Sequence, residues 1–369
     1  MITWTFALFA LGALAAARLA PLRARDTVLF SFSMAFFAAL EPWALVPLGV
    51  MALGVFYLAR AGRTKLAIAL PLVLLVGFKT YAALQATSPL RVIEEPLVPL
   101  GLSYLAFSAI HYAVELRRGR IEQPTLTAFL HFLFFFPTVT AGPIKRWEGF
   151  APLPESGWDS ARIGGLRVAG GLVKLLVLAP PCRNLVVSML EQGIWTGPKA
   201  WSVLYAASFW IYFDFSGYSD VAIGVSRVLG YRVPENFNWP FLKTNLQDFW
   251  RAWHMSLTNW LVQYVYIPLG GNRGGFARQL LNVSVVMLAI GLWHGFSLRF
   301  VSWAVFHAVG LIVFYLWRRV RPRRENPTVL GQVAAGLLTF HFVAVGFLFV
   351  FADVPTVARI VLALVGLGG

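Results

Sequence analysis

Long stretches without a charged side chain constrain this chain more than any other feature. Four of them contain no Asp, Glu, Lys or Arg: Pro42 to Ala59, Leu280 to Leu298, Phe300 to Trp317 and Asn326 to Ala352. A helix needs about 20 mostly apolar residues to cross a hydrocarbon core of about 30 Å. Only 13% of the residues are charged, against about a quarter in a soluble domain. The sequence therefore predicts an all-α, polytopic membrane protein.

Apolar runs alternate with basic or Pro/Gly-rich breaks along the chain, which predicts about ten or eleven membrane helices. We expect a single membrane domain over residues 1–369, because no polar stretch is long enough to bury a core of its own. The first run, Ile2 to Ala17, lacks the basic residues that precede the apolar part of a signal peptide. We expect it to be a retained first helix with its N-terminus outside.

The net charge of +15, from 31 Lys and Arg against 16 Asp and Glu, would make nucleic acid a candidate partner of a soluble protein. Here the basic residues lie in short loops between apolar runs, as the positive-inside rule expects of cytoplasmic loops. The basic clusters are Arg23 with Arg25, residues 60–65, residues 117–120, Lys145 with Arg146, and residues 318–324. The sequence predicts a lipid bilayer as the surroundings and no nucleic-acid partner.

The segment from Tyr231 to Gly275 is polar and aromatic at once and cannot lie bare in lipid. A Thr244-x-x-Gln247 pattern fits a capping box, which predicts a helix start there. Aromatic and apolar residues then recur at helical spacing, and Pro268 to Gly271 break the pattern. These residues are Trp250, Trp253, Leu257, Trp260 and Tyr264. The spacing predicts one amphipathic helix that lies at the interface or dips into the protein.

Histidine at membrane depth is a functional candidate, since it can stay neutral and exchange a proton near neutral pH. His294 lies in Gly291-Leu292-Trp293-His294-Gly295, where the flanking glycines would let a substrate approach the imidazole. From these residues alone a general base and a histidine hydrogen-bonded to a neighbouring helix are equally good interpretations.

The other histidines have weaker contexts. His254 follows Trp250 and Arg251 on the expected aromatic helix, where an interfacial position at headgroup level is the simpler interpretation. For His307 and His341, inside apolar runs without small neighbours, packing is favoured. His111 and His131 are interpreted as structural.

Carboxylates gather with hydroxyls in the run from Tyr212 to Asp220, which includes Asp214. They could hydrogen-bond buried backbone or orient an imidazole, and a structural use is at least as good an interpretation as a catalytic one. The chain carries no His-Glu-x-x-His, paired-cysteine or Walker pattern and no Gly-x-Ser-x-Gly elbow. No permanently bound cofactor or metal is expected.

Read together, several segments resemble the membrane-bound O-acyltransferase (MBOAT) family, in particular its bacterial branch that modifies polysaccharides such as alginate and teichoic acid. The likeness is carried by Gly101 to Tyr104, Phe135 to Ile144, Tyr212 to Gly224, Asn236 to Arg273 and Gly291 to Gly295. It is densest in Asp248-Phe249-Trp250-Arg251-Ala252-Trp253-His254 and in Tyr266-Ile267-Pro268-Leu269-Gly270-Gly271-Asn272-Arg273. Arg251-Ala252 departs from the pair of basic residues that is more usual there.

The resemblance implies a family fold of membrane helices with interfacial or re-entrant helices around a central tunnel. It also implies that His294 is the catalytic histidine and that His254 is the second histidine of the tunnel, on a different helix. We expect the substrate to be bound by residues around them, namely Trp250, Trp253, Asn236, Asp248, Arg251, Tyr212 and Asp214.

The same resemblance implies an acyl donor, acetyl-CoA or an acyl carrier protein thioester, and an extracytoplasmic glycan as acceptor. A separate extracytoplasmic acyltransferase is an expected partner, and the bacterial cytoplasmic membrane the expected location. D-alanyl transfer from a carrier protein to a teichoic-acid-like polymer is the alternative within the class. A proton-coupled transporter or lipid flippase is the alternative outside it, although transporters tend to show paired, repeat-related broken helices.

Overall fold

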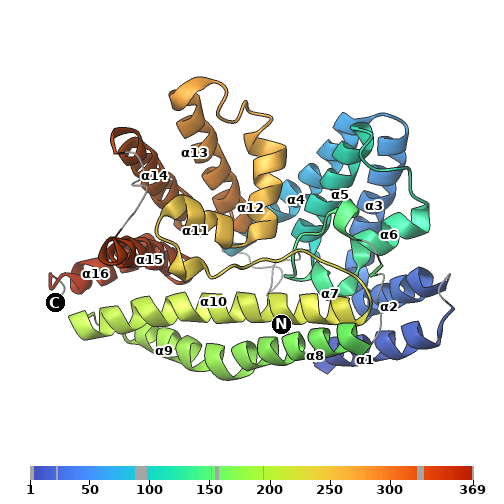
Figure 1. The fold of residues 1–369 in the computed structure, drawn as a ribbon, viewed down its shortest axis with the longest axis horizontal. Helices are drawn as coiled ribbons and strands as arrows, with labels where there is room; N and C mark the ends of the chain where they lie inside the picture. Colours follow the sequence, from blue (N-terminus) through green and yellow to red (C-terminus); the bar gives the residue numbers. More distant parts are fainter. Residues whose placement is uncertain are drawn as a thin grey trace. The chain divides into compact units, whose positions relative to one another are not determined.

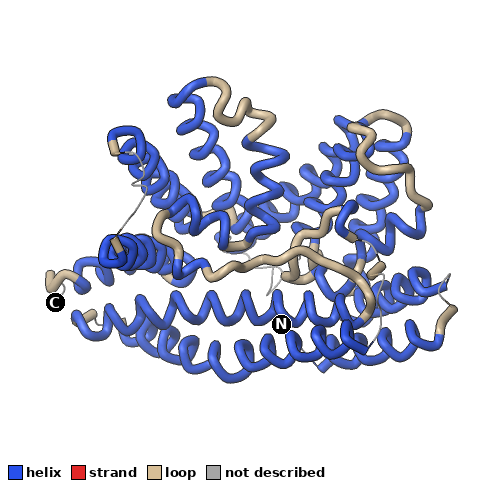
Figure 2. The backbone as a smooth tube through the Cα atoms, viewed as in Figure 1, coloured by secondary structure: helices blue, strands red, loops and turns tan. Residues whose placement is uncertain are grey.

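The computed structural model describes residues 4–21, 24–87, 98–150, 152–153, 158–193, 195–321 and 328–367. Regular structure in these residues is helical, apart from two isolated β-bridges (Figure 2). The prediction of an all-α membrane protein is confirmed. The chain divides into two compact units, residues 1–171 with 218–235, and residues 172–217 with 236–369. The single membrane domain over residues 1–369 stays a prediction.

The first unit is built on helices from the N-terminal half of the chain. They are α1 (Trp4–Leu19), α2 (Arg25–Leu40), α3 (Leu45–Arg60), α4 (Thr64–Thr87), α5 (Leu102–Arg117), α6 (Leu126–Phe134), α7 (Phe136–Val139) and most of α8 (Trp158–Val173). Aromatic side chains fill its core: the Tyr112 ring lies 4.4 Å from that of Phe129, and the Phe36 ring 5.5 Å from that of Phe136. Such pairs stabilise a fold beyond the apolar area they bury.

The second unit contains the helices that carry the two candidate histidines. They are α9 (Ala179–Gln192), the first part of α10 (Gly197–Val228), α11 (Leu246–Ala252), α12 (Met255–Leu261), α13 (Gly275–His294), α14 (Leu298–Val320), α15 (Val329–Phe351) and α16 (Val354–Leu364). Helices α13 and α14 form a hairpin and lie side by side (Figure 1). A π-helical turn, Val262–Tyr266, follows α12.

Six helical stretches of the described residues are long and apolar enough to cross a membrane. They are Pro42–Arg60, Thr64–Gln85, Trp158–Gln192, Gly275–His294, Leu298–Val320 and Val329–Phe351. This number is lower than the predicted ten or eleven because other apolar runs form shorter helices, as in α5 with 16 residues and α6 with 9. The run from Leu280 to Leu298 is not one span, since α13 ends at His294 and α14 begins at Leu298.

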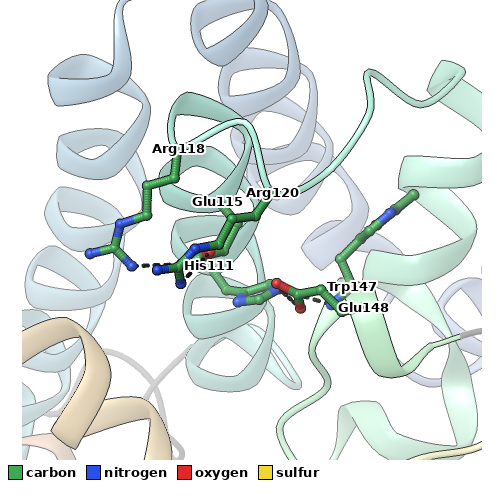
Figure 3. A network of polar contacts seen from close by, with 6 residues as sticks. All are labelled: His111, Glu115, Arg118, Arg120, Trp147 and Glu148. Carbon is green, nitrogen blue, oxygen red and sulfur yellow. Dashed lines mark hydrogen bonds and ion pairs between the residues drawn. The ribbon is translucent and has the colours of Figure 1, made fainter.

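A buried carboxylate at the end of α5 is neutralised by the loop that follows it. The Glu115 side chain is 0% exposed, and Arg118 and Arg120 donate to its two oxygens at 2.7 and 3.1 Å (Figure 3). One turn earlier, His111 Nε2 accepts from the backbone N–H of Trp147 at 2.8 Å. A buried charge is tolerated only when it is paired, so this network holds the loops of the first unit in place.

Two glycines bring α8 and α10 into backbone contact within the first unit. A Cβ atom added at Gly224 would lie 2.6 Å from the carbonyl oxygen of Gly164, and one added at Gly164 would lie 2.8 Å from the carbonyl oxygen of Gly224. Both distances are shorter than real Cβ contacts, and backbone cannot move aside as a flexible side chain can. Only glycine at both positions permits this approach.

We therefore predict that Gly224→Ala destabilises the protein by about 1–3 kcal/mol, the usual effect of overpacking. The measurement is the midpoint of thermal unfolding of purified protein in detergent. The matched control is Gly165→Ala, beside Gly164 on α8, where an added Cβ meets nothing within 4 Å. Equal midpoints for Gly224→Ala and the parent would show that the close approach is not needed.

Candidate functional site

A short backbone pairing fixes the centre of the candidate site. The N–H of Asn238 donates to the carbonyl of Ala252 at 3.0 Å, and the N–H of Met255 donates to the carbonyl of Asn236 at 2.9 Å. Phe237 and Trp253 form an antiparallel bridge between them. These bonds take up backbone groups that a continuous helix through Trp253 would use, so the chain leaves the helix there.

The predicted single helix through this segment is wrong. Helix α11 ends at Ala252, α12 begins at Met255, and His254 between them has a φ of 44°. A left-handed backbone costs a residue with a Cβ roughly 1–2 kcal/mol, and such strain is held where the surroundings over-determine it. The sequence pattern missed the break because Trp250, Trp253, Leu257 and Trp260 are all buried, as they would be on one helix face.

The predicted capping box is displaced by one residue. Asn245, and not Thr244, caps α11: its Oδ1 accepts from the N–H of Asp248 at 2.9 Å, and its Nδ2 donates to the Asp248 carboxylate at 2.7 Å. Asn is as good an N-cap as any residue, and an acidic side chain is favourable in the first turn. Asp248 therefore has a structural use at the start of the helix.

The side chain of Asn236 sets the orientation and tautomer of His254. Asn236 is 0% exposed, and its Oδ1 accepts from the Ser256 hydroxyl at 2.6 Å and from the Ser256 backbone N–H at 3.4 Å. Because a backbone N–H can only donate, the atom facing it is the amide oxygen. His254 Nδ1 lies 3.3 Å from the same oxygen, so Nδ1 carries the proton and Nε2 presents a lone pair.

His254 is enclosed by aromatic rings. Its imidazole is 4% exposed, with the edge of Phe215 at 4.7 Å and the ring of Trp293 at 6.0 Å. Burial, followed by the charge of the neighbouring His294, lowers the pKa of His254 to about 3. His254 Nε2 has no hydrogen-bond partner within the part of the chain that the structure describes. The group is a neutral imidazole with one open acceptor.

His294 is the last residue of α13 and stays exposed. Its ring lies 4.7 Å from Trp293, 5.5 Å from Phe300 in a stacked arrangement, and 5.6 Å from Trp303. Trp293 thus contacts both histidines. His254 lies between α11 and α12 and not on a helix as predicted, whereas His294 ends α13. The second unit brings both imidazoles to one indole ring.

The glycines beside His294 have a use other than the one expected from the sequence. A Cβ added at Gly291 would lie 2.6 Å from the carbonyl oxygen of Phe300, and one added at Gly295 would lie 2.9 Å from the Phe300 ring. Both therefore face α14 and permit its close packing on α13. The interpretation that they open a path for substrate is wrong, because the space beside them is filled by protein.

The other predicted site residues fall into two groups, aromatic side chains and charged side chains. Trp253 and Tyr212 join the aromatic layer around the backbone pairing, with 6.3 Å between their rings. Trp250 packs against Trp303 at 5.6 Å. Arg251 is 67% exposed and lies 3.7 Å from Asp248 in a weak surface ion pair, and Asp214 is half-buried on α10.

Two residues that contact His254 were not singled out from the sequence. Phe215 supplies the ring edge against the imidazole, and Ser256 shares the Asn236 oxygen with it. Ser256 stands two positions after the histidine, where a hydroxyl next to a buried ring is a weak signal. Phe215 lies within the Tyr212 to Asp220 run, but one phenylalanine among 31 carries no signal of its own.

The chemistry available at this site is proton transfer and hydrogen bonding. No group of three or more His, Cys, Asp or Glu side chains suited to a metal ion occurs in the described ranges. Around Trp293 the site offers the exposed imidazole of His294, the buried imidazole of His254 with a fixed lone pair, and indole N–H groups in an apolar setting. Helices long and apolar enough to span a membrane define a membrane protein, and a histidine pair beside one indole makes these two imidazoles its candidate groups for proton transfer.

Comparison with known proteins places the chain within a family. Residues 63–344 match the profile of the membrane-bound O-acyltransferase family. Because this match covers well over half of the chain, the protein belongs to that family. The likeness noted in the sequence is thereby confirmed.

Three bacterial proteins illustrate what this chain is similar to. A probable alginate O-acetylase of Pseudomonas aeruginosa is 34% identical over 259 residues, which cover 69% of this chain and 49% of that protein. A teichoic acid D-alanyltransferase of Bacillus subtilis is 30% identical, covering 69% of each chain. A peptidoglycan O-acetyltransferase of Helicobacter pylori is 29% identical, covering 74% of this chain and 58% of that protein. The chain spans about half the length of the alginate O-acetylases it matches.

The low pKa of His254 generates a prediction about stability and pH. Above pH 6.5 the imidazole is neutral in both folded and unfolded protein and contributes nothing. Between about pH 6.5 and 3 the unfolded chain binds a proton that the folded protein does not, so stability falls on acidification by about 1.4 kcal/mol per pH unit. By pH 5 the expected loss from this group is about 2 kcal/mol.

The measurement compares thermal unfolding at pH 7 and pH 5 for the parent and for His254→Asn, since asparagine tolerates the left-handed backbone and does not titrate. The unfolding midpoint of the variant should fall less on acidification. Parallel pH curves for the two proteins would contradict a buried, neutral His254.

Proposed function

We propose that the protein is an O-acyltransferase that moves an acyl group from a cytoplasmic thioester to a hydroxyl group. The proposal rests most on one observation: His294 and His254 contact the same indole, one exposed and one buried with a fixed lone pair. Family membership supports the reaction class, and the names of the three relatives all describe acyl transfer.

In the proposed reaction His294 acts as general base. Its imidazole takes the proton of the acceptor hydroxyl while the oxygen attacks the thioester carbonyl carbon. The tetrahedral intermediate then collapses, the carbon–sulfur bond breaks, and the proton held by His294 passes to the departing thiolate. The products are an ester and a free thiol. General-base catalysis of this kind contributes about 10²- to 10⁴-fold in rate.

The tautomer of His254 limits what it can do in this reaction. With Nδ1–H directed at Asn236, Nε2 has no hydrogen to offer to an oxyanion. We therefore propose that His254 accepts a hydrogen bond, either from the acceptor hydroxyl or from a protonated His294. An indole N–H is then the better donor to the developing negative charge, since such stabilisation depends on fixed donors in a dry site.

We propose acetyl-CoA as donor and an extracytoplasmic polysaccharide as final acceptor, with the protein in the cytoplasmic membrane of a bacterium. The alginate O-acetylase and peptidoglycan O-acetyltransferase relatives support an acetyl group. A separate extracytoplasmic acyltransferase is the proposed partner for the last transfer. No permanently bound cofactor enters the scheme.

D-alanyl transfer from a carrier protein is the second candidate. It is favoured by the teichoic acid D-alanyltransferase relative, in which 69% of each chain is covered. The two donors are separated directly by offering the purified protein labelled acetyl-CoA and a carrier protein loaded with D-alanine.

The proposal predicts that His294→Ala lowers the turnover number for acyl transfer by about 10²- to 10⁴-fold without lowering the unfolding temperature. His294 is exposed at a helix end, so its truncation leaves no cavity. The assay follows label from acetyl-CoA to a hydroxyl acceptor with purified protein in lipid nanodiscs.

His341→Ala is the matched control, because that imidazole is hydrogen-bonded to Tyr205 and to the Leu337 carbonyl, away from the histidine pair. It should retain parental turnover. Equal rates for His294→Ala and the parent would refute the mechanism. A parent that leaves the thioester intact while moving a solute or lipid would instead indicate a transporter.

A further inference from the structure

His307 is a buried histidine for which the proposed reaction has no use. It lies on α14, one of the membrane-spanning helices, and is 0% exposed. Neither Nδ1 nor Nε2 has a hydrogen-bond partner in the described part of the chain. A neutral imidazole has one N–H donor and one acceptor, and burying both unpaired is unfavourable. Packing, which the sequence favoured, does not explain why this side chain is polar.

Two indoles that also bury a polar atom without a described partner lie next to this imidazole. The rings of Trp250 and Trp303 lie 5.1 and 4.8 Å from the His307 ring, and 5.6 Å from each other. They are 7% and 3% exposed, and neither Nε1–H finds an acceptor among the described residues. Buried Trp N–H groups usually have a partner. Three neighbouring side chains therefore hold buried polar atoms that no described residue satisfies.

The backbone of α15 is shaped to admit this imidazole. A Cβ atom added at Gly346 would lie 2.4 Å from His307 Nε2 and 2.9 Å from its Cε1. Such a distance is too short for any real contact, so only glycine at position 346 leaves room for the ring. A position that demands glycine on a neighbouring helix indicates that the place of the imidazole is specified and not incidental.

The donors and acceptors of this cluster define the chemistry of its ligand. Trp250 and Trp303 can only donate, and neutral His307 adds one donor and one acceptor. Hydrogen-bond donors therefore exceed acceptors by three to one. The other ring contacts of His307, with Phe306 and Phe342, carry no charge, so an anionic ligand would be desolvated without compensation. A neutral oxygen with free lone pairs fits.

We propose that His307, Trp250 and Trp303 form a binding site for a neutral acceptor oxygen, supplied by a carbonyl of the acyl donor. The proposal rests on the proposed function, since the donor is the thioester substrate. Trp303 connects the His307 cluster with the proposed general base, because its ring contacts His294 at 5.6 Å and His307 at 4.8 Å. An oxygen held here lies one indole away from the proposed general base. A water molecule is the other source of the same chemistry.

The test uses the full-length protein in lipid nanodiscs and four variants. His307→Phe keeps the ring volume and removes both polar atoms, whereas His307→Gln keeps a donor and an acceptor. Gly346→Ala displaces the imidazole without changing it. Gly336→Ala is the matched control on the same helix, because a Cβ added there meets nothing within 4 Å. For each we would measure turnover with acetyl-CoA, the unfolding temperature, and the Kd of an unreactive thioether analogue. In this analogue a methylene group separates the sulfur from the carbonyl, so the carbonyl oxygen is kept.

We expect His307→Phe and Gly346→Ala to weaken binding of the thioether analogue about tenfold, the effect of one neutral hydrogen bond at the upper end of its range. His307→Gln should recover most of the affinity, and Gly336→Ala should match the parent. The unfolding temperature of His307→Phe should be unchanged or higher, because an unsatisfied polar group is removed. A residue that only packs would leave the Kd unchanged.

The remaining outcomes distinguish a donor carbonyl from a water molecule as the source of the bound oxygen. They also distinguish failure of this site from failure of the proposed function. A tenfold fall in turnover with unchanged Kd for His307→Phe and Gly346→Ala would assign the bound oxygen to water. Parental turnover and Kd in both variants would overturn the site while leaving the acyltransferase proposal intact. If the parent binds the analogue but transfers no acyl group, the proposed function fails, and the Kd values alone decide on the site.

Discussion

The carboxamide oxygen of Asn236 accepts two hydrogen bonds from Ser256 and lies 3.3 Å from His254 Nδ1, all out of contact with solvent. Every property of His254 that bears on chemistry depends on this oxygen. It selects the tautomer, orients the ring, and leaves Nε2 as the one open atom. A carboxylate at position 236 would place a buried negative charge beside the imidazole and favour its protonation, whereas an amide keeps it neutral.

The backbone around Asn236 fixes the local conformation of His254, which the Asn236 side chain alone cannot do. The bonds between Asn236–Asn238 and Ala252–Met255 interrupt what would otherwise be one helix and hold His254 at a φ of 44°. The strain of that conformation, roughly 1–2 kcal/mol, is offset by backbone hydrogen bonds in an apolar setting, where leaving those groups unpaired would be more unfavourable. On a regular helix, a histidine at this position would keep its side chain on the aromatic face, but its tautomer would not be fixed in the same way.

The sequence was sufficient for the class of fold and for the family, and it singled out the two histidines that the second unit brings to Trp293. Charge-free runs at membrane length predict helices whatever the tertiary structure, and the Trp-His motifs carry the family resemblance. What failed was local. The helix break at His254 depends on pairing with residues about 16 positions earlier, which no periodicity within the segment reveals. The use of Gly291 and Gly295 depends on the approach of α14, and the cap moved from Thr244 to Asn245 because Asp248, and not Gln247, is its partner.

The polarity of the second unit is better explained by function than by folding. If packing alone had shaped α14, phenylalanine would serve at position 307, because its ring would fill the space that Gly346 leaves open. Instead, imidazole and indole nitrogens are buried side by side with no hydrogen-bond partner among the residues that the structure describes, an arrangement that lowers stability. The same polar atoms would strengthen the hold on a neutral oxygen, because a hydrogen bond is stronger in an apolar interior than in water. Because the α13–α14 hairpin brings both His294 and His307 into contact with the Trp303 ring, a group bound at one histidine cannot be remote from the other.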